Sequence, residues 1–306
     1  MKLFVALVLI LSCLSFSVWH VNAMSSVSFS IPWDNVNAGG DEQASSLNYT
    51  VYDTVGQSAA GVAGSVSFSL EEGYRSDSNA VSLSFVIRGQ SATQTTYSNF
   101  STAASEVTVT ATTGFAVGDY IAVVENVGFG QLVALGRISQ INSLNLRVDS
   151  WGGQSGLLST VPAGGNDMVY RLGSADSVSF GTATVGNEHV ALASGSIFSS
   201  ASSGHSVYVQ ADHLLRTPAA VAITTVSDGT VSSNAEEYGA EAIGAHAVSG
   251  SVDLGVTTTQ RTVLLSTTPA ISAADRFALL FKLGITSSTT PGSYGQVVYF
   301  MLTSNF

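Results

Sequence analysis

The chain has 306 residues, of which 45% are hydrophobic and only 10% are charged, and its formal net charge is −11. An acidic surface of this kind repels nucleic acid and anionic membranes, so neither is an expected partner. The length is sufficient for two or three domains, each with a hydrophobic core of its own.

Residues 1–23 are predicted to be a secretory signal peptide. Lys2 is followed by an apolar run over residues 3–18 and by a Val-x-Ala ending at Ala23, where we expect cleavage. The run is short compared with the ~20 apolar residues of a membrane-spanning helix. The mature protein is therefore expected to be secreted, extracellular or on the cell surface, without membrane contact after signal cleavage. A retained N-terminal anchor is the alternative.

The single cysteine, Cys13, lies inside the predicted signal peptide, so no disulfide is expected in the mature chain. A secreted fold of this kind must be held together by core burial and strand pairing. Loss of Lys2 leaves nine basic residues against 21 acidic ones, which gives a net charge of −12, and Lys282 becomes the only lysine.

The first segment after the cleavage site, residues 26–31, alternates serine with apolar residues. As a strand it would place Val27, Phe29 and Ile31 on one face, with Trp33 following. A strand with one apolar face needs a sheet to join, either in its own molecule or in a neighbour. We therefore predict a donor strand over residues 26–31, with these four side chains at an interface.

The motif Ser-Val-Ser-Phe occurs three times, at residues 26–29, 65–68 and 177–180. The first two copies continue the alternation with Ser-Ile and Ser-Leu. The pattern is interpreted as a weak repeat in a serine-rich chain.

Period-two segments dominate the chain, which predicts an all-β, multi-domain protein. Residues 24–105 are expected to form a short N-terminal β segment that contains the donor strand and ends in a Ser/Thr-rich connector from residue 91. Five short strands within residues 106–172 are typical of a small β-barrel or roll. The number and spacing of strands in residues 173–306 favour a β-sandwich.

Two segments near the C-terminus decide how this sandwich is built. Residues 270–283 carry apolar side chains at alternate positions from Phe277 to Leu283, with Lys282 on the other parity, so we predict a strand and not a helix. Residues 296–302 are apolar on both faces, which is typical of a central strand or of an interface strand.

Three groups of segments resemble modules of uncharacterised secreted bacterial β-rich surface proteins with a pilin-like C-terminal β-sandwich. They are residues 48–57 with 68–75, residues 113–121 with 137–138 and 144–148, and residues 178–183 with 206–210 and 290–294. The resemblance implies a surface location and assembly into a filament or layer. The chain departs from disulfide-bonded fimbrial pilins because its predicted mature form has no cysteine.

No catalytic residue is predicted, and we do not expect an enzyme. The chain has no His-Glu-x-x-His, Cys-x-x-Cys or Gly-x-Ser-x-Gly motif, and Ser155 misses the register of the last of these. On one strand His205 and His213 would lie ~27 Å apart, too far to share a zinc ion.

No cofactor or metal is predicted, although a structural calcium ion is a weak alternative. Oxygen-bearing side chains on a Gly/Ser-rich loop suit calcium, but their spacing matches no established calcium loop. A solvated acidic loop is the competing interpretation. The candidates are Asp228, Asn234, Glu236, Glu237 and Glu241.

The function expected from these features is that of an extracellular structural subunit whose strand 26–31 joins an open sheet edge of the next copy. The partner is then the protein itself, as a homopolymer. The alternative is a monomeric or tethered adhesin whose loops bind a glycan or a host protein. A secreted hydrolase is a third hypothesis without motif support.

Overall fold

The computed structural model of the chain describes residues 82–173 and 177–305 in full. At Ser174 and in six short strands before residue 73 it describes the backbone alone. The chain divides into two units, Met1–Ala80 and Val81–Phe306. The prediction of an all-β protein is confirmed, because the described residues contain strands and no helix. Within these residues, accordingly, no helix is long and apolar enough to cross a membrane.

In the first unit the described strands pair as three small hairpins, β1 with β2, β3 with β4 and β5 with β6. Their bounds are β1 Ser25–Ser26, β2 Phe29–Ser30, β3 Ala44–Ser46, β4 Tyr49–Val51, β5 Gly61–Ser65 and β6 Phe68–Glu72. Two-stranded ribbons as short as these are marginally stable by themselves.

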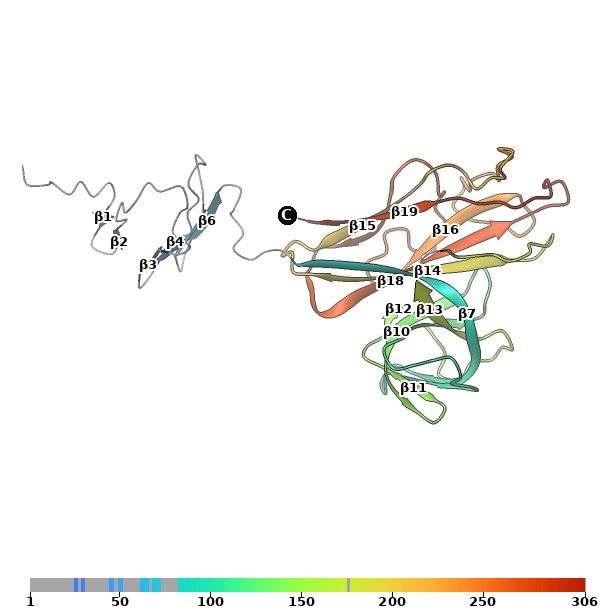
Figure 1. Ribbon diagram of the computed structural model, residues 1–306, viewed down its shortest axis with the longest axis horizontal. Helices are drawn as coiled ribbons and strands as arrows, with labels where there is room; N and C mark the ends of the chain where they lie inside the picture. Colours follow the sequence, from blue (N-terminus) through green and yellow to red (C-terminus); the bar gives the residue numbers. More distant parts are fainter. Residues whose placement is uncertain are drawn as a thin grey trace, which may run out of the picture. The chain divides into compact units, whose positions relative to one another are not determined.

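The second unit begins with a closed antiparallel barrel of six strands (Figure 1). Its order is β7–β8–β11–β10–β9–β13, and β13 pairs back onto β7. The strands are β7 Leu83–Ser101, β8 Glu106–Val109, β9 Tyr120–Glu125, β10 Leu132–Asn142, β11 Asn145–Val148 and β13 Met168–Ser174, and β12 Gly152–Gly153 pairs with β10. Its interior is filled by buried side chains such as Phe100, Ile121 and Leu146.

Two sheets packed face to face form the sandwich-like remainder of this unit. The larger sheet runs from the first half of β7 through β14 His189–Ser199 and β18 Ala270–Gly284 to β16 Glu237–Ile243. The smaller sheet has the order β17 Arg261–Ser266, β15 His205–Ala211, β19 Val298–Ser304. A common core that includes Ile197, Val207 and Phe277 lies between them.

The predicted strand over residues 270–283 is confirmed as β18, and its two faces serve two cores. Phe277, Leu279 and Phe281 enter the sandwich core. The alternate residues Ala278 and Leu280 pack instead against the outside of the barrel, in a third cluster. The barrel is thus fixed to the outer face of the larger sheet, below the sandwich in Figure 1.

The long strand β7 differs from the sequence-based interpretation of residues 91–105 as a connector. Residues 83–89 pair with β14 in the sandwich, residues 88–96 pair with β13, and residues 97–101 pair with β8. A boundary at residue 105 therefore cuts through the barrel. The reason is that the inward positions of this strand are occupied by small polar residues in place of apolar ones. Thr95, for example, is buried, and its Oγ1 lies 3.0 Å from Thr110 Oγ1.

Candidate functional site

The sandwich has four sheet edges, and short segments cover two of them on the same side of the molecule. Along β16, Tyr238 bridges to Thr225 and Ala240 to Leu254. Along β17, Leu264 bridges to Ala247. These contacts satisfy backbone groups that an open edge would leave unpaired.

The two remaining edges, residues 83–87 of β7 and the outer side of β19, have no strand partner among the described residues. Both contribute half-buried apolar side chains to the same core, among them Phe85 and Ile87 from β7 and Phe300 from β19. The strand orders of the two sheets place β7 opposite β19, because β14 connects to β15 and β17 to β18 at the ends of the sandwich. One side of the sandwich is therefore bounded by two uncovered strands.

The backbone of β19 directs a row of hydrogen-bonding groups away from the sheet. Asp212 N donates to Val297 O at 3.0 Å, and Asn305 N donates to Gly204 O at 2.9 Å. The backbone N–H and C=O groups of the odd-numbered residues of this strand therefore point toward β15. In an antiparallel ladder the backbone groups of the even-numbered residues then point away from β15, toward the other edge of β19. Their side chains (Val298, Phe300 and Leu302) turn toward the core. The outer edge of β19 thus presents backbone hydrogen-bonding groups sideways, while the apolar side chains of the same residues turn into the core.

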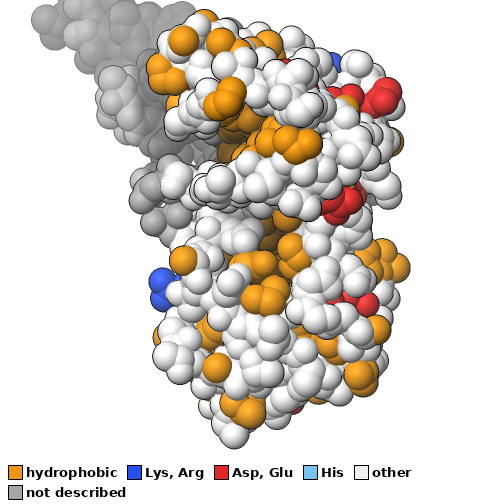
Figure 2. Space-filling view, turned by 90° about the vertical axis from the view of Figure 1, so that its right-hand side faces the viewer, with side chains coloured by type: hydrophobic (Ala, Val, Ile, Leu, Met, Phe, Trp, Pro, Cys, Tyr) orange, Lys and Arg blue, Asp and Glu red, His pale blue; other side chains and the backbone are white. Residues whose placement is uncertain are grey.

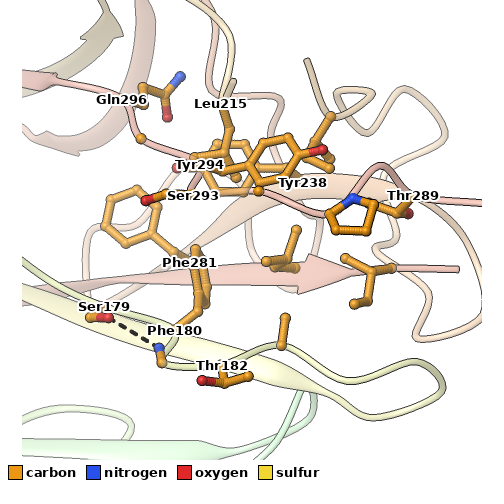
Figure 3. A pocket seen from close by; sticks show the side chains of 18 of the residues that line it. Ser179, Phe180, Thr182, Leu215, Tyr238, Phe281, Thr289, Ser293, Tyr294 and Gln296 are labelled. Carbon is orange, nitrogen blue, oxygen red and sulfur yellow. Dashed lines mark hydrogen bonds between the residues drawn. The ribbon is translucent and has the colours of Figure 1, made fainter. Parts of the chain in front are cut away.

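At the end of the sandwich where β19 begins, the two sheets enclose an apolar pocket of about 970 Å³. Figure 2 shows this end as a hollow with a hydrophobic interior. Figure 3 shows the aromatic rings that surround it, Phe180, Tyr238, Phe281 and Tyr294. Tyr238 stacks on Phe281 with ring centroids 6.3 Å apart and meets Phe180 edge-on at 6.2 Å. We call this cavity the end pocket.

No side chain that lines the end pocket carries a charge. The lining consists of apolar, hydroxyl, tyrosine, glycine, proline and one glutamine residue. Burial raises the pKa of Tyr238 far above its ordinary range, so its hydroxyl stays neutral. The pocket walls therefore supply no charged acid, base or metal ligand, and suit the burial of apolar side chains.

Gln296, just before β19, contributes a polar side chain to the wall of the end pocket. Its Nε2 donates to His213 O at 2.6 Å and to Val256 O at 3.2 Å, which fixes the orientation of the amide because both acceptors are carbonyls. Its Oε1 is buried and has no hydrogen-bond partner within the described structure. A buried unpaired acceptor is costly, and because this oxygen is inaccessible to solvent, its cost belongs to the fold and not to contact with an occupant of the pocket.

The third copy of the Ser-Val-Ser-Phe motif lies in the wall of this pocket. Val178 and Phe180 turn inward and pack against the sandwich core, while Ser177 and Ser179 border the opening. Val178 lies against Gly89 of β7, where a Cβ atom would come within 3.0 Å of it. The segment pairs with no strand, yet it shows that the sandwich accepts alternate Val and Phe side chains of this motif.

The structure locates only part of the predicted donor strand. Val27, Ile31 and Trp33 lie outside the described residues. Phe29 belongs to β2, whose backbone pairs with β1 in the register Ser26 with Phe29. The described backbone of this segment forms two short strands, β1 and β2, that pair with each other.

The five calcium candidates are not gathered into one site. Asp228 accepts a hydrogen bond from Thr230 N at 3.1 Å, and Glu237 accepts one from Ser232 N at 3.1 Å. Glu241 is buried on β16 and pairs with Lys282. Among the residues that can be described, no group of three His, Cys, Asp or Glu side chains could hold a metal ion. The acidic side chains of this region serve local turns and one ion pair.

One polar cluster was not predicted from the sequence. Asp275 Oδ2 lies 2.9 Å from His205 Nε2 and 2.9 Å from His246 Nδ1. His205 is fully buried and Asp275 nearly so, whereas the side chain of His246 is 38% exposed. These residues are distant in the sequence. The packing of the two sheets brings them together, because His205 lies on β15 of the smaller sheet and Asp275 on β18 of the larger one.

This cluster makes stability depend on pH. Burial alone would raise the pKa of Asp275, but the hydrogen bonds and charges of His205 and His246 together lower it below its ordinary value. A carboxylate whose pKa is lowered in the folded state stabilises the fold at any pH above its unfolded pKa of ~3.9. This contribution is lost as the pH falls through the pKa of the folded state. Asp275→Asn should lower Tm by several degrees at pH 7, from the loss of two charge-assisted hydrogen bonds worth ~1.5–3 kcal/mol.

The measurement is the thermal midpoint of both proteins between pH 2 and 7. The difference between them should shrink below pH 4, while Asp228→Asn, at an exposed carboxylate, should follow the wild type throughout. A difference that stays constant down to pH 2 would show that ionised Asp275 does not stabilise the fold.

Together these features define an all-β protein in which a closed barrel supports a sandwich with one side that no described strand covers. No protein-family model matches the chain, and neither does a curated protein or a solved structure.

Proposed function

We propose that the protein is an extracellular structural subunit that assembles into a filament or layer by strand addition between copies. Residues 26–31 of one copy would extend along β19 of the next and place Val27, Phe29 and Ile31 over the sandwich core and toward the end pocket. Six residues of a strand span ~20 Å, which suits β19 with its seven residues.

The observation that carries this proposal is the combination of an uncovered edge with an unfilled apolar pocket at the same strand. Main-chain hydrogen bonds to β19 would supply affinity, and alternate apolar side chains would fix the register. The inward packing of Val178 and Phe180 supports the choice of occupant, because residues 26–29 repeat the same four letters.

Head-to-tail addition of this kind generates open chains of subunits. The donor belongs to Met1–Ala80 and the acceptor to Val81–Phe306, so each copy has one of each. Because donor and acceptor are different surfaces, the contact is heterologous and need not close into a ring.

Engineered cysteines test the pairing directly, since the only cysteine, Cys13, lies in the predicted signal peptide and can be replaced by serine. Ser28→Cys combined with Thr303→Cys, or with Tyr299→Cys, should give a ladder of disulfide-linked multimers on non-reducing gels. Strand neighbours bring Cα atoms within the ~4.4–6.8 Å that a disulfide needs. We expect at least one pair to cross-link ten times more than the control.

The matched control places the second cysteine on the covered side, as Ser28→Cys with Thr262→Cys on β17. Equal cross-linking of the control and of both β19 pairs, or none in any pair, would contradict addition to β19.

The end pocket also favours a second candidate, a monomeric or tethered adhesin. Hydroxyl groups of Thr286, Thr289 and Ser293 lie at the rim of an aromatic-walled cavity, an arrangement that suits an apolar or sugar ligand. This candidate expects purified protein to remain monomeric while it binds glycans, and the cross-linking experiment then gives no multimers.

A further inference from the structure

Half of the eight arginines in this acidic chain lie around one aromatic ring, that of Tyr120 at the start of β9. The guanidinium carbon of Arg88 on β7 lies 3.4 Å from the ring centroid, and those of Arg276 and Arg137 lie at 5.7 Å and 5.9 Å. Arg171 on β13 borders the same groove, which has a volume of about 790 Å³. We call it the arginine groove.

The nearby carboxylates balance only part of this charge. Arg276 is buried, and its two terminal nitrogens are engaged, with Nη2 2.7 Å from Asp149 Oδ2 and Nη1 2.6 Å from Ser150 O. Arg171 lies 3.9 Å from Asp119, too far for a hydrogen bond. Arg88 and Arg137 have no carboxylate within 4.0 Å among the residues that the structure describes. Among the described residues four cations thus face two anions, in a protein whose net charge is −11.

The side chain of Arg88 is held in place for a ligand. Burial lowers the pKa of Arg88, while its interaction with Tyr120 acts in the opposite direction. The guanidinium is therefore partly removed from water, and none of the described carboxylates lies within 4.0 Å of it. The guanidinium of Arg88 is held over the Tyr120 ring by a cation–π contact, and it carries several N–H donors in a planar fork. Such donors match the two oxygens of a carboxylate or phosphate.

We propose that the arginine groove binds an acidic ligand that carries two or more carboxylate or phosphate groups. Arg88 is the anchor, and Arg137 and Arg171 contact further acidic groups of the same ligand. The guanidinium carbons of Arg88 and Arg137 both lie within 5.9 Å of the same ring centroid, so the two side chains can contact neighbouring acidic groups of one ligand. The site is on the barrel side of β7 and does not depend on the proposed strand addition.

Isothermal titration of the full chain with trigalacturonate and with inorganic tripolyphosphate tests the proposal, with maltotriose as the neutral probe. At least one acidic probe should bind, and its affinity should fall about tenfold in Arg88→Ala and in Arg137→Ala, as expected for the loss of one charge-assisted contact. Arg88→Lys, which keeps the charge but loses the planar fork, should bind with intermediate affinity. Arg261→Ala removes an exposed arginine elsewhere and should leave binding unchanged.

The two acidic probes separate a carboxylate ligand from a phosphate ligand, and binding of either supports the site. If neither binds more tightly than maltotriose, or if Arg137→Ala binds as well as the wild type in a protein with unchanged Tm, the proposal is wrong. The exposed position of Arg137 makes that variant independent of folding defects at Arg88.

Discussion

Deletion of residues 24–33 is expected to abolish assembly and leave soluble monomers. The deletion removes the predicted donor strand, while the acceptor side of the sandwich belongs to the separate unit Val81–Phe306. The monomer should therefore retain the thermal midpoint of this unit. Negative-stain microscopy and sedimentation of secreted material measure the outcome, with fibres or sheets expected from the wild type and none from the deletion.

Two matched triple substitutions test whether assembly needs the apolar side chains of the donor strand or only its backbone. Val27→Ser, Phe29→Ser and Ile31→Ser together should abolish assembly, because the side chains that fix register and fill the pocket are lost. Ser26→Thr, Ser28→Thr and Ser30→Thr change the opposite face and should assemble normally. Fibres that persist after deletion of residues 24–33 would reject this donor, and residues 65–70 would then be the next segment to delete.

The sequence was sufficient to predict strands whose inward residues are apolar. The alternation from Phe277 to Leu283 predicted β18, and the structure confirms it. The same rule failed for residues 91–101, because the inward positions of this part of β7 include Ser91, Thr93 and Thr95. Small polar residues can occupy a barrel interior when their hydroxyl groups pair, as Thr95 does with Thr110.

The candidate site could be predicted only in part. Apolar residues on both faces of residues 296–302 indicated a central or an interface strand, and the structure places them in β19, which pairs with β15 alone. Which edge of a sheet stays uncovered depends on contacts such as Ala240 with Leu254, whose partners have no signal in their local sequence. The arginine groove was missed for the same reason, since its arginines come from four different strands.

Lys282 and its two carboxylate partners form a buried ionic cluster. Lys282 Nζ lies 2.7 Å from Glu241 Oε2 and 2.8 Å from Asp253 Oδ1, and all three side chains are at most 10% exposed. Asp253 also accepts a hydrogen bond from Val231 N at 2.7 Å. Lys282→Met would leave two buried carboxylates without a cation, which is expected to cost ~3–5 kcal/mol of unfolding free energy.

Urea unfolding of the full chain measures this cost as a lower midpoint. The triple variant Lys282→Met, Glu241→Gln, Asp253→Asn should recover most of the loss, because removal of all three charges also removes the desolvation penalty. Asp228→Asn, at an exposed carboxylate, should change stability by less than ~0.5 kcal/mol. Equal midpoints for Lys282→Met and the wild type would show that the buried charges are compensated in another way.

The same cluster explains how the chain fixes the register of β18, which is apolar on both faces from Phe277 to Phe281. Hydrophobicity alone distinguishes the two faces of this strand poorly, since Ala278 and Leu280 face the barrel while Phe277 and Leu279 face the sandwich. A slip of one residue would exchange the faces and would move the ammonium group of Lys282 into the aromatic core beside Tyr238. The ion pairs with Glu241 and Asp253 thus disfavour a one-residue slip and help to keep the barrel in its position on the sheet.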